Sequence, residues 1–206
     1  MANRSYIIST FVTENSPYEQ VAKEYLLPSA QKLGLEVEVM VMPNLHNWNY
    51  NVGQKPLAVL KLMEKFPDKD IVLLDADAKI ESYPFLFDTL AEKDIDIAAH
   101  TLSWETHYNR PGAKEKELLS GTLWLRNCDK VKELCNAWHF EYTRTSQWEQ
   151  ICLFSVLKKG DYKIFQLPLS YAYITSMPTG EEPFVKIENP VITHWQVSRT
   201  LKRMPL

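Results

Sequence analysis

The stretch Ile71-Val72-Leu73-Leu74-Asp75-Ala76-Asp77 decides which fold this sequence favours. Four consecutive large apolar residues are typical of a β-strand buried on both faces, as in the parallel sheets of α/β proteins. Two carboxylates two positions apart follow this run, and in an extended segment they point to the same side. In α/β sheets, ligands bind beyond the carboxyl ends of the strands. Asp75 and Asp77 are therefore predicted to converge at a ligand-binding edge.

The segments on either side alternate between strand and helix patterns. Ser16-Pro17-Tyr18-Glu19 has capping-box spacing with Pro at the first helical position, which predicts a helix start. This helix should run toward Gly34 and be kinked or ended early at Pro28. Strands are expected at 6–12, 36–42, 71–74, 95–99, 118–126, 164–167 and 191–193, and further helices at 56–65, 84–92, 129–144 and 148–159. The alternation predicts an α/β fold with a mostly parallel sheet of about seven strands.

Two long segments, 43–54 and 101–116, show neither pattern and are expected to be loops. Long connections in a compact domain more often line a site than serve only as connectors. The carboxyl ends of parallel strands share one edge of a sheet. The site is therefore expected just after Val12, Met42, Leu74 and Ala99.

Composition narrows the class of protein. The chain has 206 residues, of which 45% are hydrophobic, and this suits one domain spanning residues 1–206. A formal net charge of -3 gives no basic footprint for sequence-independent nucleic-acid binding. Cys128, Cys135 and Cys152 lack C-x-x-C spacing, so neither a disulfide framework nor a zinc site is implied. No apolar run is long enough to cross a bilayer, and we expect a cytoplasmic protein with reduced thiols.

The two aspartates carry the clearest chemical signal. Carboxylate oxygens are the ligands that hard divalent cations prefer. A buried strand that ends in two carboxylates loses solvation energy unless a cation or hydrogen-bond donors meet them. A divalent ion at this edge would neutralise the charge that develops on a departing diphosphate. The alternative is a solvated Asp pair in an ordinary turn.

With later motifs, this pattern resembles the nucleotide-sugar glycosyltransferases of the GT-A fold, particularly the retaining glycogenin-like and lipopolysaccharide-sugar group and its small phage and bacterial relatives. Val191-Ile192-Thr193-His194-Trp195 looks like the late strand whose His completes the metal site. The resemblance implies Mn²⁺ or Mg²⁺ held by Asp75, Asp77 and His194, and a UDP-sugar as donor; imidazole favours Mn²⁺. A hydrogen-bonded core histidine is the alternative for His194.

The resemblance also implies residues that bind the donor. Tyr18 would stack on the base, Lys55 would reach the phosphates from the start of a helix, and Gly121 would allow close approach of the sugar. Their alternatives are a helix-surface aromatic, an exposed lysine and a β-bulge. The basic segment 198–203 looks like the one that meets the diphosphate, and its alternative is a solvated tail. The full donor set is Thr13, Tyr18, Lys55, Asp75, Ser120, Gly121, Arg199 and Lys202.

Glu149-Gln150 looks like the catalytic Asp-Gln pair of the glycogenin-like group, although Glu replaces Asp. The resemblance implies a retaining reaction in which these side chains steady an oxocarbenium-like transition state and the leaving diphosphate assists attack. The polar first turn of a helix is the alternative for this pair. An inverting enzyme would need a carboxylate base for the acceptor hydroxyl, and Glu105 is the candidate in that case.

Two acceptor classes stay open: a hydroxymethylated DNA base, as for phage-encoded relatives that act in the host cytoplasm, and a saccharide. An acidic protein that acts on DNA must gather basic side chains near its site, here Arg110, Lys114 and Lys116 together with Arg199, Lys202 and Arg203. One rival function is a sugar-1-phosphate nucleotidyltransferase, but Thr13-Glu14-Asn15-Ser16 lacks the Gly-rich phosphate loop of that class. The other is a non-catalytic nucleotide-sugar-binding module.

Overall fold

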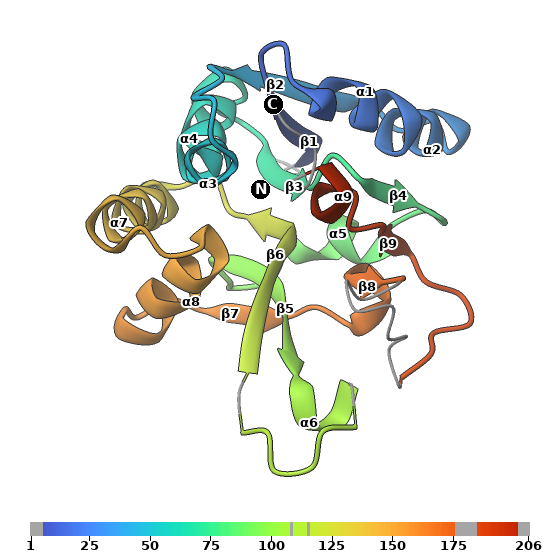
Figure 1. The fold of residues 1–206 in the computed structure, drawn as a ribbon, viewed down its shortest axis with the longest axis vertical. Coiled ribbons are helices and arrows are strands. Elements are labelled where there is room, and N and C mark those ends of the chain that lie inside the picture. The colour runs from blue at the N-terminus through green and yellow to red at the C-terminus, as the bar shows by residue number, and fades with distance from the viewer. Residues whose placement is uncertain (1–5, 108, 115, 176–184, 202–206) are drawn as a thin grey trace.

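A six-stranded mixed sheet forms the centre of the computed structural model, which describes residues 6–107, 109–114, 116–175 and 185–201 (Figure 1). The strand order is β2-β1-β3-β6-β5-β7. β1 pairs in parallel with β2 and β3, β5 pairs in parallel with β7, and β6 runs antiparallel to both of its neighbours. The strands are β1 Tyr6–Thr13, β2 Val37–Met42, β3 Asp70–Leu74, β5 Ile97–Ser103, β6 Lys116–Leu125 and β7 Ile164–Gln166.

Helices cover both faces of this sheet, as expected for an α/β fold. Every residue of β3 is buried, and successive side chains enter opposite cores because strand side chains alternate. Ile71 and Leu73 pack with α4, α7 and α8, whereas Val72 and Leu74 pack with α2 and α5. These helices are α2 Leu26–Lys32, α4 Lys55–Lys65, α5 Phe85–Leu90, α7 Asp129–Thr145 and α8 Glu149–Lys159. The α/β prediction is thus confirmed.

The first predicted helix is divided at a different residue from the one expected. Tyr25, three residues before Pro28, separates α1 Pro17–Glu24 from α2. Proline lacks an N–H and clashes with the carbonyl four residues earlier, so it is tolerated only in a helix's first turn, where Pro28 lies. The predicted start is correct, but no capping box forms: the Glu19 carboxylate accepts from the N–H of Asn15.

A small second sheet lies beside the end of β3. It consists of β4 Ala78–Ile80, β9 Ile192–His194 and β8 Tyr173–Ile174, in the order β4-β9-β8. Of these strands only β9 was expected. A 3₁₀ turn, η1 Leu169–Tyr171, precedes β8, and α9 Ser198–Leu201 follows β9.

The two expected loops both contain regular structure. Segment 43–54 includes the short helix α3 Trp48–Val52, and α4 starts one residue before its expected position. Segment 101–116 includes the end of β5, the helix α6 Trp104–His107 and the first residue of β6. β5 and β6 pair with each other beyond the rest of the sheet and, with α6, form an arm that points downward in Figure 1. We call residues 100–119 the β5–β6 extension.

The described residues include no helix long and apolar enough to cross a membrane. Cys128, Cys135 and Cys152 are free thiols. Cys135 and Cys152 lie in the core, as expected, and Cys128 is half-buried. Burial raises the pKa of the Cys135 thiol to about 12, so this group is an unreactive thiol at neutral pH.

Candidate functional site

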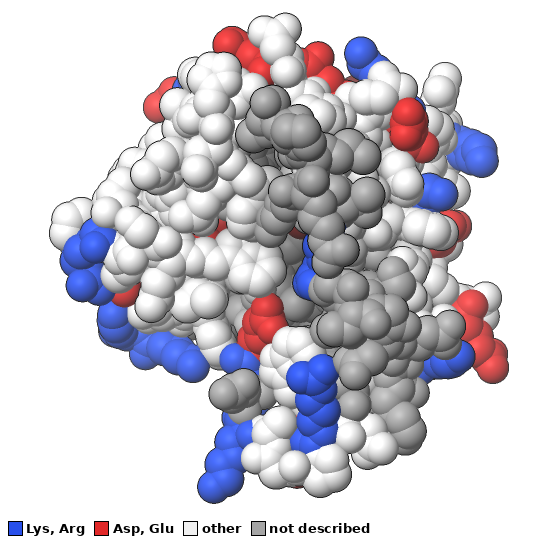
Figure 2. All heavy atoms as spheres, viewed as in Figure 1, with Lys and Arg blue, Asp and Glu red and all other residues white. Residues whose placement is uncertain are grey.

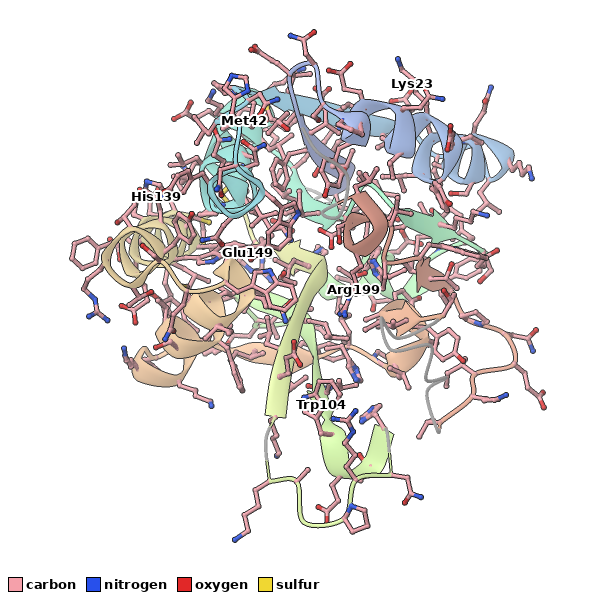
Figure 3. All side chains as sticks on the ribbon, in the orientation of Figure 1. Lys23, Met42, Trp104, His139, Glu149 and Arg199 are labelled. Carbon is pink, nitrogen blue, oxygen red and sulfur yellow. The ribbon has the colours of Figure 1, made fainter. Side chains whose placement is uncertain are left out.

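A cavity of about 350 Å³ opens at the ends of β1 and β3, beside β6. Figure 2 shows a hollow in the middle of this face with acidic atoms around it. Figure 3 places Glu149 and Arg199 on opposite sides of β6, with Trp104 farther along that strand, and all three residues line the cavity. The segments after β1, β3 and β5 contribute lining residues, as expected, whereas the segment after β2 contributes them only from Trp48 onward.

Asp75, Asp77 and His194 come together in this cavity. Each offers one ligand atom, and the three atoms lie within 4.8 Å of one another. β4 begins directly after Asp77, and its first residue, Ala78, pairs with His194 on β9. The pairing of the small sheet therefore brings a residue from the end of the chain to the two aspartates.

Burial gives two of these ligand groups unusual acid–base properties. It raises the pKa of Asp77 to about 6, and the charge of Asp75 adds to this effect. It lowers the pKa of His194 to about 4, so the imidazole is neutral at pH 7. Thr122 Oγ1 lies 2.8 Å from His194 Nε2 and orients the ring. With Nε2 held this way, Nδ1 is the nitrogen that can act as a ligand.

Gly121 allows these side chains to approach β6. A Cβ atom at this position would lie 2.9 Å from His194 Cε1 and 3.1 Å from Asp75 Oδ2. Of the two interpretations of this glycine, the β-bulge is observed. β5 pairs through Ala99 with Leu123 and through His100 with Leu119, so three residues of β6 bulge between these pairs. The bulge turns this backbone toward the ligand cluster.

Lys55 and Glu149 form a buried charged network beside Asp75. Lys55 Nζ lies 2.9 Å from Asp75 Oδ1 and 3.1 Å from Glu149 Oε1, and the side chains of Lys55 and Glu149 are 4% and 3% exposed. Ser120 Oγ donates to Glu149 Oε1 at 2.8 Å. Burial alone would lower the pKa of Lys55, but the two carboxylates outweigh it and raise the pKa. Burial raises the pKa of Glu149. Lys55 is thus a buried ammonium and not an exposed surface lysine.

Glu117 is a lining residue that the sequence analysis missed. It is half-buried, accepts a hydrogen bond from Gln150 Nε2 through Oε1, and accepts one from Trp104 Nε1 through Oε2 at 3.1 Å. Burial raises its pKa, partly offset by the Trp104 hydrogen bond and the charge of Arg199. No motif marked Glu117, because its position in the cavity depends on the pairing of β5 with β6 in the β5–β6 extension. Glu105 is exposed on α6 and does not line the cavity.

The remaining predicted donor residues lie near the ends of β1 and β9. Thr13 is buried and lines the cavity. Tyr18 lines it too, and burial raises the pKa of its phenol to about 12, so it is not a helix-surface aromatic. Arg199 lines the cavity from α9, beside Gln196, whose side chain accepts from Arg199 Nε. Lys202 and Arg203 lie outside the described residues.

Two tryptophans complete the wall near Tyr18. Trp48 and Trp148 both line the cavity, and their ring centroids lie 6.1 Å apart. Neither was singled out from the sequence as a site residue, since isolated aromatics are more often core residues. Of the basic residues expected near a DNA acceptor, Arg110, Lys114 and Lys116 are exposed and do not line the cavity.

Comparison with known proteins gives its result at the level of structure. No protein-family model matches the chain, and the comparison with curated proteins finds no match. A glycosyltransferase involved in the glycosylation of the major capsid of PBCV-1 superposes with a TM-score of 0.67 at 13% identity, covering 95% of this chain and 97% of that one. The glycosyltransferase GlyE of Streptococcus pneumoniae TIGR4 gives 0.61 at 12% identity, covering 99% of this chain and 58% of GlyE.

The galactosyltransferase LgtC, solved with donor and acceptor sugar analogs, gives a TM-score of 0.54 at 10% identity, covering 92% of this chain and 86% of that one. At such low identity the likeness concerns the path of the backbone. The chain therefore has the GT-A fold of the nucleotide-sugar glycosyltransferases.

Proposed function

We propose that this protein is a metal-dependent glycosyltransferase that transfers a sugar from a nucleotide diphosphate, with a UDP-sugar as the first donor to test. The convergence of Asp75, Asp77 and His194 within 4.8 Å, at the sheet edge where α/β proteins bind their ligands, carries this proposal. We further propose that these three side chains hold the cation, and that Thr13, Tyr18, Lys55, Ser120, Gly121, Arg199 and Lys202 bind the donor.

The residues present fit a divalent cation. Two carboxylates and one neutral imidazole supply hard oxygen ligands and one borderline nitrogen, a set that suits Mn²⁺ better than Mg²⁺. Gly121 leaves free the space that a Cβ would fill beside His194 and Asp75. Asp75, Asp77 and Glu149 lie around a single buried ammonium, that of Lys55. This excess of negative charge is unfavourable in a buried site and is relieved when a cation binds.

The chain's own cations would bind the diphosphate and receive its charge. A bound divalent cation supplies Lewis-acid stabilisation of the leaving diphosphate. Lys55 and Arg199 provide an ammonium and a guanidinium in the same cavity, and both favour phosphate oxygens. The Lys55 ammonium is held in place by Asp75 and Glu149. This preorganisation reduces the cost of orienting charge during the reaction.

In the proposed reaction, the bond between sugar C1 and the diphosphate oxygen breaks, and its electron pair leaves with the diphosphate. The acceptor oxygen forms a new bond to C1, and its proton passes to the departing diphosphate. We propose retention of configuration, with Glu149 and Gln150 stabilising the positive charge on the sugar ring. The anomeric configuration of the product, determined by NMR, tests this step directly.

A thermal-shift screen with nucleotide diphosphates and Mn²⁺ tests the function. UDP and Mn²⁺ together should raise Tm more than the sum of their separate effects, since each completes the other's coordination. Asp75→Asn and Asp77→Asn should remove this joint effect while the fold survives, because an amide keeps the shape but loses the charge. Glu92→Gln, a change at an exposed glutamate, is the control. Independent effects of UDP, GDP and ADP with Mn²⁺ would refute a joint site.

A further inference from the structure

The β5–β6 extension adds a second polar centre to the cavity. Glu117 lies four residues before Gly121 on β6, outside the bulge that contains Gly121. The metal-ligand candidates lie beside Gly121, so Glu117 is well separated from them. This spacing leaves room for a transferred sugar between the diphosphate site and the extension. Glu117 is therefore on the side of the cavity away from the metal-ligand candidates, where it contacts Gln150.

The Glu117 carboxylate is already held in one orientation. Trp104 Nε1 donates to Oε2 at 3.1 Å, and the Gln150 amide donates to Oε1. Each carboxylate oxygen has a second lone pair, so both can still accept a hydrogen bond from a ligand hydroxyl. Because two donors already fix this side chain, less side-chain entropy is lost when a ligand binds to it.

Apolar side chains line the cavity near Trp104. Leu102, Leu119 and Ile174 line the same cavity, and Trp104 packs against the cluster that they form. An apolar wall with a few placed polar groups is typical of small-molecule sites. A pyranose matches this wall, because its C–H face is apolar and its hydroxyls project from the edge, where Glu117 can accept them. An indole is the aromatic side chain with the largest face for such stacking.

The charges of the cavity argue against a nucleic-acid acceptor. The described lining residues include four carboxylates and two cations, namely Asp75, Asp77, Glu117 and Glu149 against Lys55 and Arg199. Nucleic-acid binding depends on neutralising phosphates with basic side chains. In Figure 2 basic atoms lie along the left, lower and right borders of this face, with a few in its middle. The Arg110 guanidinium packs over the Trp104 ring, 4.8 Å from its centroid, outside the cavity.

We propose that Trp104 and Glu117 form the acceptor subsite and that its occupant is a neutral pyranose, with the ring on the indole and one hydroxyl donating to the carboxylate. This inference rests on the proposed function, since it names the acceptor of that same reaction. It also gives the β5–β6 extension a function, namely acceptor binding. The proposed metal ligands and donor residues lie outside this extension, apart from Ser120 and Gly121, which directly follow it.

The test measures transfer from radiolabelled UDP-glucose and UDP-galactose, with Mn²⁺, to methyl glucoside, methyl galactoside and methyl mannoside. A duplex that contains 5-hydroxymethylcytosine is the competing acceptor. Glu117→Gln should raise the KM for the best glycoside by about tenfold or more, the usual worth of a hydrogen bond to a charged group. Trp104→Ala should do the same, and Trp104→Phe should have a smaller effect because it keeps a stacking face. Glu92→Gln and Phe140→Ala, both at exposed positions, are the matched controls.

Donor binding separates this inference from the proposed function. Joint stabilisation by UDP and Mn²⁺ should be unchanged in the Glu117 and Trp104 variants. Unchanged acceptor KM in Glu117→Gln and Trp104→Ala would overturn the subsite while the proposed function stands. Transfer to the hydroxymethylated duplex but to no glycoside, or donor hydrolysis with transfer to neither, would overturn the pyranose assignment. Absence of both donor binding and hydrolysis in the wild type would overturn the proposed function, and the inference with it.

Discussion

Replacing Lys55 by Met tests the buried charged network most directly. Lys55 is the only cation within 4 Å of Glu149 among the described ion pairs, and both side chains are almost fully buried. Removal of one partner of such a pair leaves an uncompensated buried charge and costs about 3–5 kcal/mol. Total stability is about 5–15 kcal/mol for a typical domain, so the variant should fold but unfold at much lower urea concentration. Urea titrations followed by far-UV circular dichroism measure this difference.

The pH dependence of the Lys55→Met variant identifies the responsible charge. The folded pKa of Glu149 is already raised by burial and should rise further when the ammonium is lost. An acid with a raised folded pKa destabilises the fold above that pKa, and this cost disappears as the pH falls. The variant should therefore recover stability, relative to the wild type, when the pH is lowered from neutral to mildly acidic values. Lys55→Met should also cost much less in a Glu149→Gln background. Equal costs in both backgrounds, or at neutral and mildly acidic pH, would refute the reasoning.

Three further results are expected. Gly121→Ala should weaken Mn²⁺ binding in calorimetric titrations and cost about 1–3 kcal/mol of stability, because its Cβ would lie 2.9 Å from His194 Cε1; unchanged Mn²⁺ affinity would count against the cluster. Below pH 6.5 the unfolded state binds a proton that buried His194 refuses until about pH 4, so His194 should contribute a loss of up to about 3 kcal/mol of stability across that range, which Asp77 opposes because its pKa is raised; a His194→Gln variant with the same pH slope as the wild type would exclude the His194 contribution. Gly53→Ala should destabilise by about 1–3 kcal/mol in thermal unfolding, because a Cβ would lie 2.2 Å from the Tyr142 ring, which anchors α3; a neutral effect would mean that the ring can move aside.

The order of strands and helices could be predicted because each long element carries its own pattern. The apolar run 71–74 and the alternating valines after Gly34 both became strands of the main sheet. Pro28 was correctly expected to limit where a helix can form, but the expected kink or end at Pro28 itself is not observed. A proline ends a helix only if residues before it have already formed one, and here a new helix starts early enough to place Pro28 in its first turn.

The β5–β6 extension could not be predicted, and neither could the residues that depend on it. Segment 101–116 contains Gly, Pro and scattered charges, which favoured a loop. Its strand pairing is fixed by contacts between β5 and β6 and not by a local periodicity. Glu117 was therefore not distinguishable from any other charged residue near a strand end, whereas Glu105, in the middle of the same segment, attracted attention and lies outside the cavity.

The position of His194 shows how a motif and a distant residue become one site. The motif fixes where Asp75 and Asp77 lie, but it says nothing of which late residue meets them. That choice depends on the register of a three-residue strand pair, in which Ala78 opposes His194 and Ile80 opposes Ile192. Because strand side chains alternate, a slip of one residue would turn the His194 side chain to the opposite face of the small sheet.

The neighbours of His194 indicate what holds this register. Thr193, on the opposite face, donates through its hydroxyl to the Glu81 carboxylate at 2.9 Å, and the Lys79 ammonium lies 4.5 Å from the centroid of the Trp195 ring. Ile192, two residues from His194, is fully buried among apolar residues of the core. A shifted strand would expose Ile192 and leave Glu81 without Thr193. The apolar and polar contacts of β9 thus position the imidazole against Gly121, so the geometry of the proposed metal site depends on packing at residues outside that site.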